Sequence, residues 1–461
     1  MSKYDRAFYR LEKVVDVYKR KTLMGQSHRE HFEEGKHKLS SFQIPPALKS
    51  LNVCCFVIGE SVSFFGSWMT QIALVWMVYQ LTNSAVLVGV AGFTNQAMGL
   101  VITPLVGVLL DRWNVRYVLL TTQLLSILLS FTLTILTLNG HLNVIWIIAI
   151  GTLQGTIKAF DLPARLVTIP RLVENKAETY SAVSIHSFSI NTAKFASPMI
   201  AGLLLARSGA AACFLIDAVT YIPFISAILT AQIRALPNNS SSQKTPFLKN
   251  LKEGFIFAYE FLPIRYTFVL QIVICFMAMT HVNLMPIFTQ TILSGNAETM
   301  GFLMTASALG SIIAGFYLIL RKQVIGLEKV ITRSTIILGL GLMLFSRYSN
   351  LEICLVLIFL VGMSNTLTLA AIGNFVQSIL PDENKRGRVT SIFTTGFLGI
   401  LPFGNLFFGG LTNQIGVANA LFFGGMCCLL GAFYFFRQES KIRSILQSVY
   451  IKMGLTATSN Q

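Results

Sequence analysis

The chain of 461 residues is 53% hydrophobic and only 12% charged, whereas soluble globular proteins contain about 25% charged residues. With 35 phenylalanines and 34 glycines besides, too little polar surface remains to cover a water-soluble globule. The composition indicates a membrane protein and argues against soluble enzymes and nucleic-acid-binding modules, although the net charge of +16 needs its own explanation.

Residues 1–50 are predicted to form a charged N-terminal tail. Phe8, Leu11, Val15 and Tyr18 recur at helical spacing among several lysines and arginines. Two interpretations are open: an amphipathic helix that lies on anionic lipid, or a solvated tail. The tail lacks the apolar core of a cleavable signal peptide.

Apolar segments of membrane-spanning length follow the tail. A hydrocarbon core of about 30 Å requires about 20 helical residues, and twelve apolar runs of roughly this length lie between charged or turn-rich breaks. The sequence therefore predicts an all-α membrane protein with twelve transmembrane helices. The predicted spans cover approximately residues 53–79, 85–110, 117–138, 143–160, 181–206, 211–233, 266–292, 300–320, 328–346, 353–378, 389–411 and 417–436.

The basic residues alternate between the two ends of these spans. The tail and the segments that follow even-numbered spans contain 33 of the 36 lysines and arginines. The other loops contain Arg207 and Arg347, and Lys194 lies inside a span. By the positive-inside rule both termini face the cytoplasm. This topology accounts for the net charge, so the sequence predicts no nucleic-acid partner.

A polar, turn-rich stretch divides the chain into two halves of six spans each. Ile169-Pro170 before the fifth span and Leu380-Pro381 before the eleventh stand at corresponding positions of the two halves. Parallel repeats of this kind are typical of transporters whose site lies between the halves. The predicted parts are the cytoplasmic tail at 1–50, the first half at 51–233, a cytoplasmic linker at 234–263, the second half at 264–437 and a cytoplasmic C-terminal tail at 438–461.

Motifs of enzyme chemistry are absent from the sequence. The seven cysteines lie in or at the edge of apolar spans, with no CxxC pair and no histidine spacing typical of a zinc site. No nucleophile elbow, phosphate-binding glycine loop or HExxH helix occurs. The sequence thus predicts no enzyme activity, no cofactor and no metal site, and the cysteines are interpreted as core residues.

A cluster of charges follows the second span in the sequence Gly107-Val-Leu-Leu-Asp111-Arg112-Trp113-Asn114-Val115-Arg116. Gly107 allows close helix packing, and the short loop places one acid and two bases at the membrane surface. Asp111 is expected to face a helix N-terminus, where negative charge is favoured. Arg116 is expected to pair with Asp161, at the end of the fourth span.

This loop resembles the pattern G-x-x-x-D-R-x-x-x-R of the major facilitator superfamily, with Asn114 where Gly is frequent. The resemblance covers roughly residues 58–437. In detail, the chain resembles an exporter subfamily that includes enterobactin and macrolide exporters. The matching segments are GSWM at 66–69, VYQLT at 78–82, FDLPAR at 160–165, NTAKFASPMIAG at 191–202 and GRV at 387–389.

The resemblance implies alternating access, in which the halves rock about a central site. It implies a gating cluster that holds the cytoplasmic side closed in the outward-open state, formed by Asp111, Arg112, Arg116, Asp161 and Arg165. The alternative is a surface cluster that only fixes topology, and for Arg165 an ordinary positive-inside charge.

The fifth span resembles an antiporter motif in part, through Ser197, Pro198 and Gly202. Ser197 stands where relatives carry Gly. Lys194 stands where they carry Arg, which keeps the positive charge but loses the planar guanidinium group with its paired N–H donors. The counterpart of the Asp-Arg loop in the second half, at 315–322, lacks an acid. Export is therefore favoured more strongly than proton coupling.

Three charges inside the spans are candidates for substrate binding or proton coupling: Glu60, Lys194 and Asp217. Burial favours the neutral form of a carboxyl group, so Glu60 is either a proton-exchanging carboxylate or one neutralised by a neighbouring base. Lys194 either meets an anionic substrate or pairs with an acid. Asp217 is expected to make a helix-end or gating contact. His186 and His281 are interpreted as core histidines.

The predicted function is secondary transport: export of an amphiphilic small molecule, a siderophore or drug, across the inner membrane in exchange for protons. The alternatives are an importer or facilitator of the same fold and a non-transporting membrane sensor. The expected partners are the small-molecule substrate and the lipid bilayer. An outer-membrane or periplasmic export partner is also open.

Overall fold

The computed structural model describes residues 50–110, 112–173, 178–234, 256, 258–321, 325–380 and 383–452. The predicted N-terminal tail, most of the predicted linker, Asp111 and Pro381 lie outside these residues. The described residues are almost entirely helical and contain no strand.

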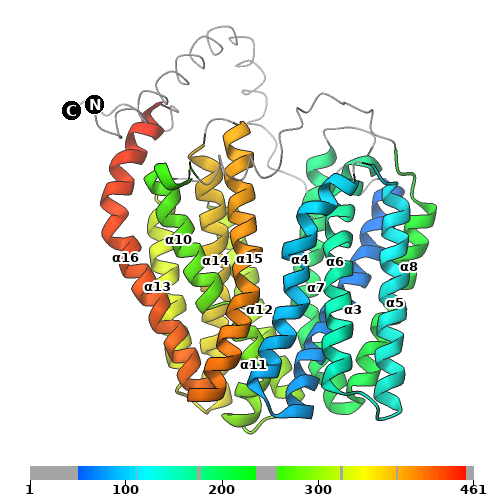
Figure 1. Cartoon of the computed structure of the whole chain (residues 1–461). Helices are drawn as coiled ribbons and strands as arrows, with labels where there is room; N and C mark the ends of the chain where they lie inside the picture. The colour runs from blue at the N-terminus through cyan, green and yellow to red at the C-terminus, as the bar shows by residue number, and fades with distance from the viewer. Residues whose placement is uncertain are drawn as a thin grey trace.

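The helices of the described residues follow one another with short connections (Figure 1). They are α3 (Leu51–Thr82), α4 (Ala85–Leu110), α5 (Val115–Leu138), α6 (Val144–Leu172), α7 (Thr179–Arg207), α8 (Gly209–Thr230), α10 (Leu262–Met277), α11 (His281–Thr291), α12 (Ala297–Leu320), α13 (Leu327–Phe345), α14 (Leu351–Ser378), α15 (Glu383–Ile415) and α16 (Val417–Lys452).

The prediction of an all-α membrane protein with twelve crossings is confirmed. Eleven helical segments of the described residues are long and apolar enough to cross a membrane, with α10 and α11 counted together. The remaining crossing is α13, which has 19 residues and carries Glu328, Lys329 and Arg333 in its first two turns. It packs between α14 and α16 inside the second half.

Asparagine side chains start several of these helices. At the starts of α5, α6, α12 and α14 an asparagine oxygen accepts a hydrogen bond from a backbone N–H of the first turn. Such caps satisfy donors that have no partner within the helix, so the short polar connections define where each crossing begins. The capping residues are Asn114, Asn143, Asn296 and Asn350.

Two crossings differ from their predicted form. The fourth was expected to end near residue 160, but α6 continues to Leu172 through Pro163 and Pro170. Asp161 and Arg165, expected at the cytoplasmic end of this span, instead lie within α6, where they form an ion pair. The seventh, expected as one span, breaks at residues 278–280 into α10 and α11.

The helices form two halves, α3–α8 and α10–α16, which lie side by side in Figure 1. We call the side where α3 begins and α16 ends the terminal face, and the opposite side the far face. Each crossing runs from one face to the other, so the first residues of α4 and α12 and the last residues of α7 and α15 lie near the far face.

Two helix pairs make most of the contact between the halves, α4 with α15 and α7 with α12, and α11 adds smaller contacts to α3 and α4. Glycines let their backbones touch near the far face. A Cβ placed on Gly89 would lie 3.0 Å from the Cα of Gly409, and one on Gly202 would lie 2.7 Å from the Cα of Gly301. Figure 1 shows α4 and α15 converging in this direction. We call these two glycine pairs the far-face seam, and they bring the two halves into contact near the far face.

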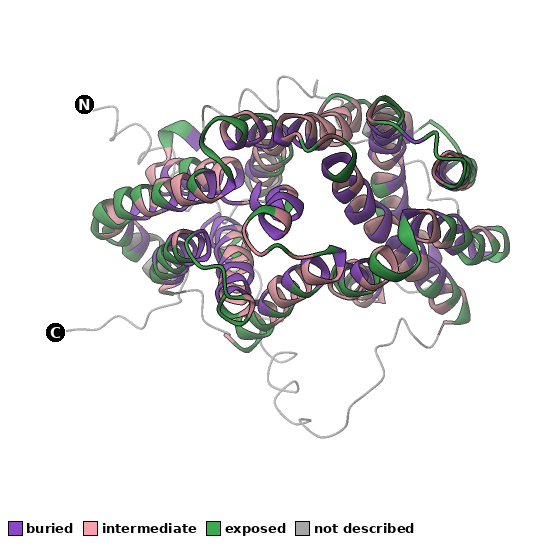
Figure 2. Cartoon of the chain, turned by 90° about the horizontal axis from the view of Figure 1, so that it is seen from below, coloured by how far each residue is buried: buried purple, intermediate pink, exposed green. Residues whose placement is uncertain are grey.

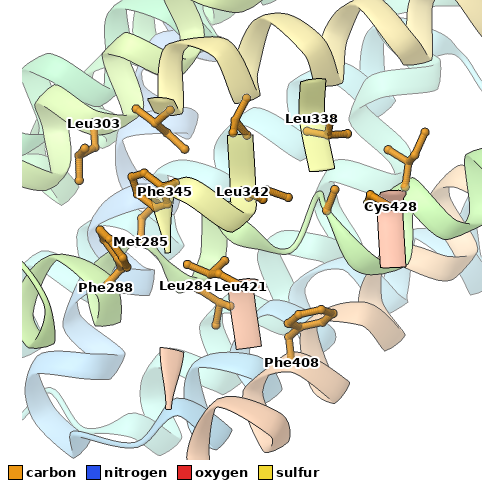
Figure 3. Close-up of a cluster of buried hydrophobic side chains, with 14 of the residues drawn as sticks. Leu284, Met285, Phe288, Leu303, Leu338, Leu342, Phe345, Phe408, Leu421 and Cys428 are labelled. Atoms are coloured by element: carbon orange, nitrogen blue, oxygen red, sulfur yellow. The ribbon is translucent and has the colours of Figure 1, made fainter. Parts of the chain in front are cut away.

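Apolar side chains both fill the bundle and cover it. Figure 2 shows buried residues turned inward and exposed residues on the outer surface of the helix ring. Large hydrophobic side chains such as Leu138, Ile145 and Leu320 are more than 70% exposed, as expected for a surface that faces lipid. Inside the second half, Phe288 stacks on Phe345 with ring centres 4.2 Å apart (Figure 3).

Candidate functional site

Arg165 is the centre of a buried charge cluster in the first half. It lies on α6 and is only 1% exposed. Its Nε donates to Asp161 Oδ2 at 2.7 Å, one helical turn away, and its Nη1 lies 3.8 Å from Glu60 Oε1 on α3. The guanidinium is held between the rings of Phe64 and Phe224, at 4.3 and 4.2 Å from their centres. Two carboxylates therefore share one arginine.

Glu60 has a second basic neighbour, His186 on α7, whose Nδ1 lies 2.9 Å from Glu60 Oε2. Glu60 is fully buried and His186 is 2% exposed. The interpretation of Glu60 as a carboxylate beside a base thus agrees with the geometry. His186 was interpreted as a core histidine, but its side chain is the direct partner of this acid.

Asp161 does not pair with Arg116, contrary to the sequence-based expectation. Its Oδ1 instead accepts hydrogen bonds from Gln123 Nε2 at 2.7 Å and Thr122 Oγ1 at 3.1 Å. These residues lie about two turns beyond Arg116 on α5, a distance of roughly 10 Å along the helix axis. Arg116 donates to the backbone oxygen of Ala231. The two charges are therefore at different depths of the bundle.

We call Glu60, Asp161, Arg165 and His186 the charge cluster. With both carboxylates ionised and Arg165 protonated, it carries one uncompensated negative charge if His186 is neutral. An uncompensated charge of this kind is costly in a buried site.

A second polar group lies deeper towards the far face. Asp217 was expected at a helix end, but it is fully buried two turns inside α8, and its Oδ2 accepts a hydrogen bond from Ser130 Oγ at 2.6 Å. Asp217, Asp161 and Lys158 line a small cavity of about 20 Å³. Lys158 lies in the middle of α6 and donates to Gln71 Oε1 at 3.3 Å.

A larger cavity of about 220 Å³ lies between the two halves. The first half contributes side chains from α3 and α7, and the second half contributes side chains from α11, α12 and α14. Its wall combines amides and one ammonium group with methionines and aromatic surface, the mixture typical of small-molecule sites. The residues that line this central cavity include Trp68, Gln71, Lys194, His281, Met300, Met304 and Asn365.

The helix-5 residues singled out from the sequence meet at the border of the halves. Ser197 Oγ donates to the backbone oxygen of Phe65 at 3.0 Å within the first half. Pro198 lines the central cavity, and Gly202 is part of the far-face seam with Gly301. A role of these residues in antiport remains a prediction.

The predicted gating loop is described in part, because Asp111 lies outside the described residues. Arg112 is exposed and lies with Trp113 and Tyr117 beside a groove between α5 and α6. Trp113 stacks on Phe160, with ring planes 9° apart and centres separated by 6.4 Å. The loop thus packs within the first half near the terminal face.

A bundle of twelve crossings in two halves, with a ligand-sized cavity between them, defines a membrane transporter. The transmembrane secretion effector family matches residues 48–448, so the chain belongs to this family of the major facilitator superfamily. The family also indicates that the protein is a transporter and not an enzyme.

Relatives with named activities are similar over most or part of the chain. The staphyloferrin A transporter of Staphylococcus aureus is 28% identical over 395 residues, covering 84% of this chain and 97% of the relative. Macrolide efflux protein A of Streptococcus pyogenes is 22% identical, covering 80% and 91%. The enterobactin exporter of Shigella boydii is 28% identical over 222 residues, covering 48% of this chain and 50% of that protein.

Solved structures are similar in fold. The nucleoside transporter NupG superposes with a TM-score of 0.65 at 13% identity, covering 84% of this chain and 98% of NupG. A bacterial homologue of the human lysosomal transporter Spinster, in an inward-facing and unoccupied conformation, gives a TM-score of 0.61 at 13% identity, covering 89% and 99%.

Proposed function

We propose that the protein exports an amphiphilic small molecule, a siderophore or a drug, across the inner membrane by alternating access with proton exchange. The central cavity between the halves carries this proposal. The names of the relatives support the substrate range, since they include a siderophore transporter, a siderophore exporter and a macrolide efflux protein.

The positive-inside pattern supports a cytoplasmic terminal face. Of the 33 basic residues placed on this side, Lys158 and Arg165 are now within the bundle, and the rest keep the asymmetry. The far-face seam then closes the cavity on the outside. In this state the cavity takes up substrate from the cytoplasm, as export requires.

Gating follows from what the two faces contain. Opening the far face separates the glycine pairs of the seam and brings the terminal face together. Arg112 is exposed in the described state, and Asp111 precedes it in the sequence. When the terminal face closes, this loop comes within reach of the second half. A charge contact formed in only one state shifts the equilibrium by its differential energy, which is the gating role that we propose for this loop.

Proton exchange is proposed to occur at the charge cluster. Its four residues come from α3, α6 and α7, so its geometry depends on how these helices are arranged. Glu60 on α3 and His186 on α7 contact each other directly. Movement of α7 relative to α3 changes the distance between them, which links this contact to alternating access.

Inverted membrane vesicles test this function. A pH gradient is imposed, and uptake of staphyloferrin A, enterobactin and a macrolide is followed together with proton release from the vesicles. We expect gradient-driven uptake of at least one compound, which is abolished in Glu60→Gln and His186→Asn. Lys441→Gln, an exposed site on the end of α16, is the control. Uptake that is independent of the gradient would refute antiport. Release of the compound from the interior of loaded vesicles into the medium would indicate import.

A further inference from the structure

The charge of the central cavity is one-sided. Lys194 on α7 lies in its wall, and its ammonium group is 5.0 Å from the centre of the Trp68 ring. None of the described residues that line the cavity is an aspartate or glutamate, and Lys194 makes no ion pair within the described part of the chain. The buried acids Glu60 and Asp161 of the first half contact Arg165, and Asp217 accepts a hydrogen bond from Ser130 on α5 through Oδ2.

The second half contributes polar atoms that lack partners. His281 is 3% exposed, and its Nδ1 lies 2.6 Å from the backbone oxygen of Ala278 at the break between α10 and α11. Since a carbonyl oxygen only accepts, Nδ1 carries the proton, and Nε2 is a buried acceptor without a hydrogen-bond partner. Asn365 Oδ1 on α14 is also a buried acceptor without a partner. A hydroxyl or N–H group of a ligand would satisfy these two atoms, whereas a carboxylate would not.

A neighbouring lysine orients one polar side chain of the cavity wall. Lys158 donates to Gln71 Oε1, and Gln71 lines the central cavity. The amide oxygen of Gln71 is therefore turned towards Lys158, which leaves its N–H groups as donors for other contacts. Lys158 itself lines the small cavity that it shares with Asp161 and Asp217, so Lys194 is the ammonium group that an anion in the central cavity meets.

We infer that the central cavity binds a carboxylate-bearing, amphiphilic anion, with the carboxylate at Lys194 and the apolar part against Trp68, Met300 and Met304. This inference rests on the proposed function and names its substrate class. A carboxylate forms a charge-assisted hydrogen bond with the ammonium group, whereas a cationic drug is repelled by Lys194. Acidic siderophores are consequently substrates, and permanently cationic drugs are not.

Two dyes that share a xanthene skeleton but carry opposite charge test the inference. The full-length protein in phosphatidylcholine nanodiscs is titrated with fluorescein, which is anionic at neutral pH, and with a cationic rhodamine methyl ester. We expect the wild type to bind fluorescein more tightly. Lys194→Gln should weaken fluorescein binding about tenfold, while Lys194→Arg should keep most of it. Lys441→Gln makes the same chemical change on an exposed helix end and should bind like the wild type.

A second measurement uses the wild-type protein, so its result does not depend on whether the Lys194→Gln variant folds. Fluorescein should slow acylation of Lys194 by acetic anhydride, read by mass spectrometry, and should leave Lys441 unaffected. A wild type that prefers the rhodamine, a Lys194→Gln variant that binds fluorescein normally, or acylation of Lys194 that fluorescein does not slow would each overturn the inference.

These outcomes are distinct from those of the proposed function. Charge preference is measured at equilibrium, without a gradient or a transport direction. Anion binding without gradient-driven uptake would refute proton-coupled export and leave the site intact. Gradient-driven export of cations with no anion binding would refute the site and leave export intact.

Discussion

Replacement of Arg165 by methionine removes the positive charge of the buried cluster while keeping a long apolar side chain. In the wild type this guanidinium neutralises Asp161 at 2.7 Å and lies 3.8 Å from Glu60. The substitution leaves both carboxylates buried with His186 as the remaining base. The first half is therefore expected to lose much of its stability.

The magnitude follows from the burial of these groups. Removing one partner of a buried ion pair costs about 3 to 5 kcal/mol, and the loss of contact with two aromatic faces adds about 1 to 2 kcal/mol. The total is reduced if a carboxyl group takes up a proton. We therefore expect Arg165→Met to lower the free energy of unfolding by about 4 kcal/mol at neutral pH.

Unfolding in mixed micelles, followed by tryptophan fluorescence, measures this loss. Arg347→Met is the matched control, since Arg347 is exposed near the far face and contacts only the ring of Phe422 among the described residues. It should change stability by less than about 1 kcal/mol. Adding Glu60→Gln to Arg165→Met should restore about 1 to 2 kcal/mol. A loss below 1 kcal/mol for Arg165→Met, or no recovery in the double variant, would refute the assignment of Arg165 as the neutralising group.

Three further substitutions test the fold and the seam. Gly409→Ala should separate the halves at the far face, because the added Cβ would lie 2.9 Å from the Cα of Gly89. Gly410→Ala is the control, because its Cβ would meet open space and should leave the distances across the far face unchanged. Spin-label distances across the far face measure this effect, and equal distances in both variants would contradict it. Asp217→Asn should change the free energy of unfolding by less than about 1 kcal/mol, because the amide keeps an oxygen for the serine hydroxyl and removes a buried charge; a larger loss in the same unfolding assay would show that its ionised form is required. Phe345→Ala, at a side chain with no exposed surface, should cost about 3 to 5 kcal/mol in that assay.

The crossings were predictable because lipid thickness fixes the length of each apolar run. The prediction failed where charged residues are buried and compensate one another. Lys158, Asp161 and Arg165 were interpreted as belonging to a cytoplasmic end, but they lie within α6. The spacing of Asp161 and Arg165 by four residues, which places both side chains on one helix face, was the available signal for a continuous helix.

The site was predictable only in its individual charges. Glu60 was identified, but its contact with His186 joins residues 126 positions apart, and no local pattern encodes it. The contribution of the second half was missed because it carries no charge and no motif. His281 follows a helix break at 278–280 that contains neither proline nor glycine, so the sequence offered no signal for it.

The far-face seam has a consequence for how the protein evolves. Its two crossings bring backbone against backbone, at Gly89 with Gly409 and at Gly202 with Gly301. Side chains of α4 and α15 also meet between the halves, as Gln96 does with Asn405. Closure on that side therefore depends on four positions staying small and is indifferent to the chemistry of the cargo. The cavity wall can change its residues, and hence the compound carried, while the same closing surface is retained.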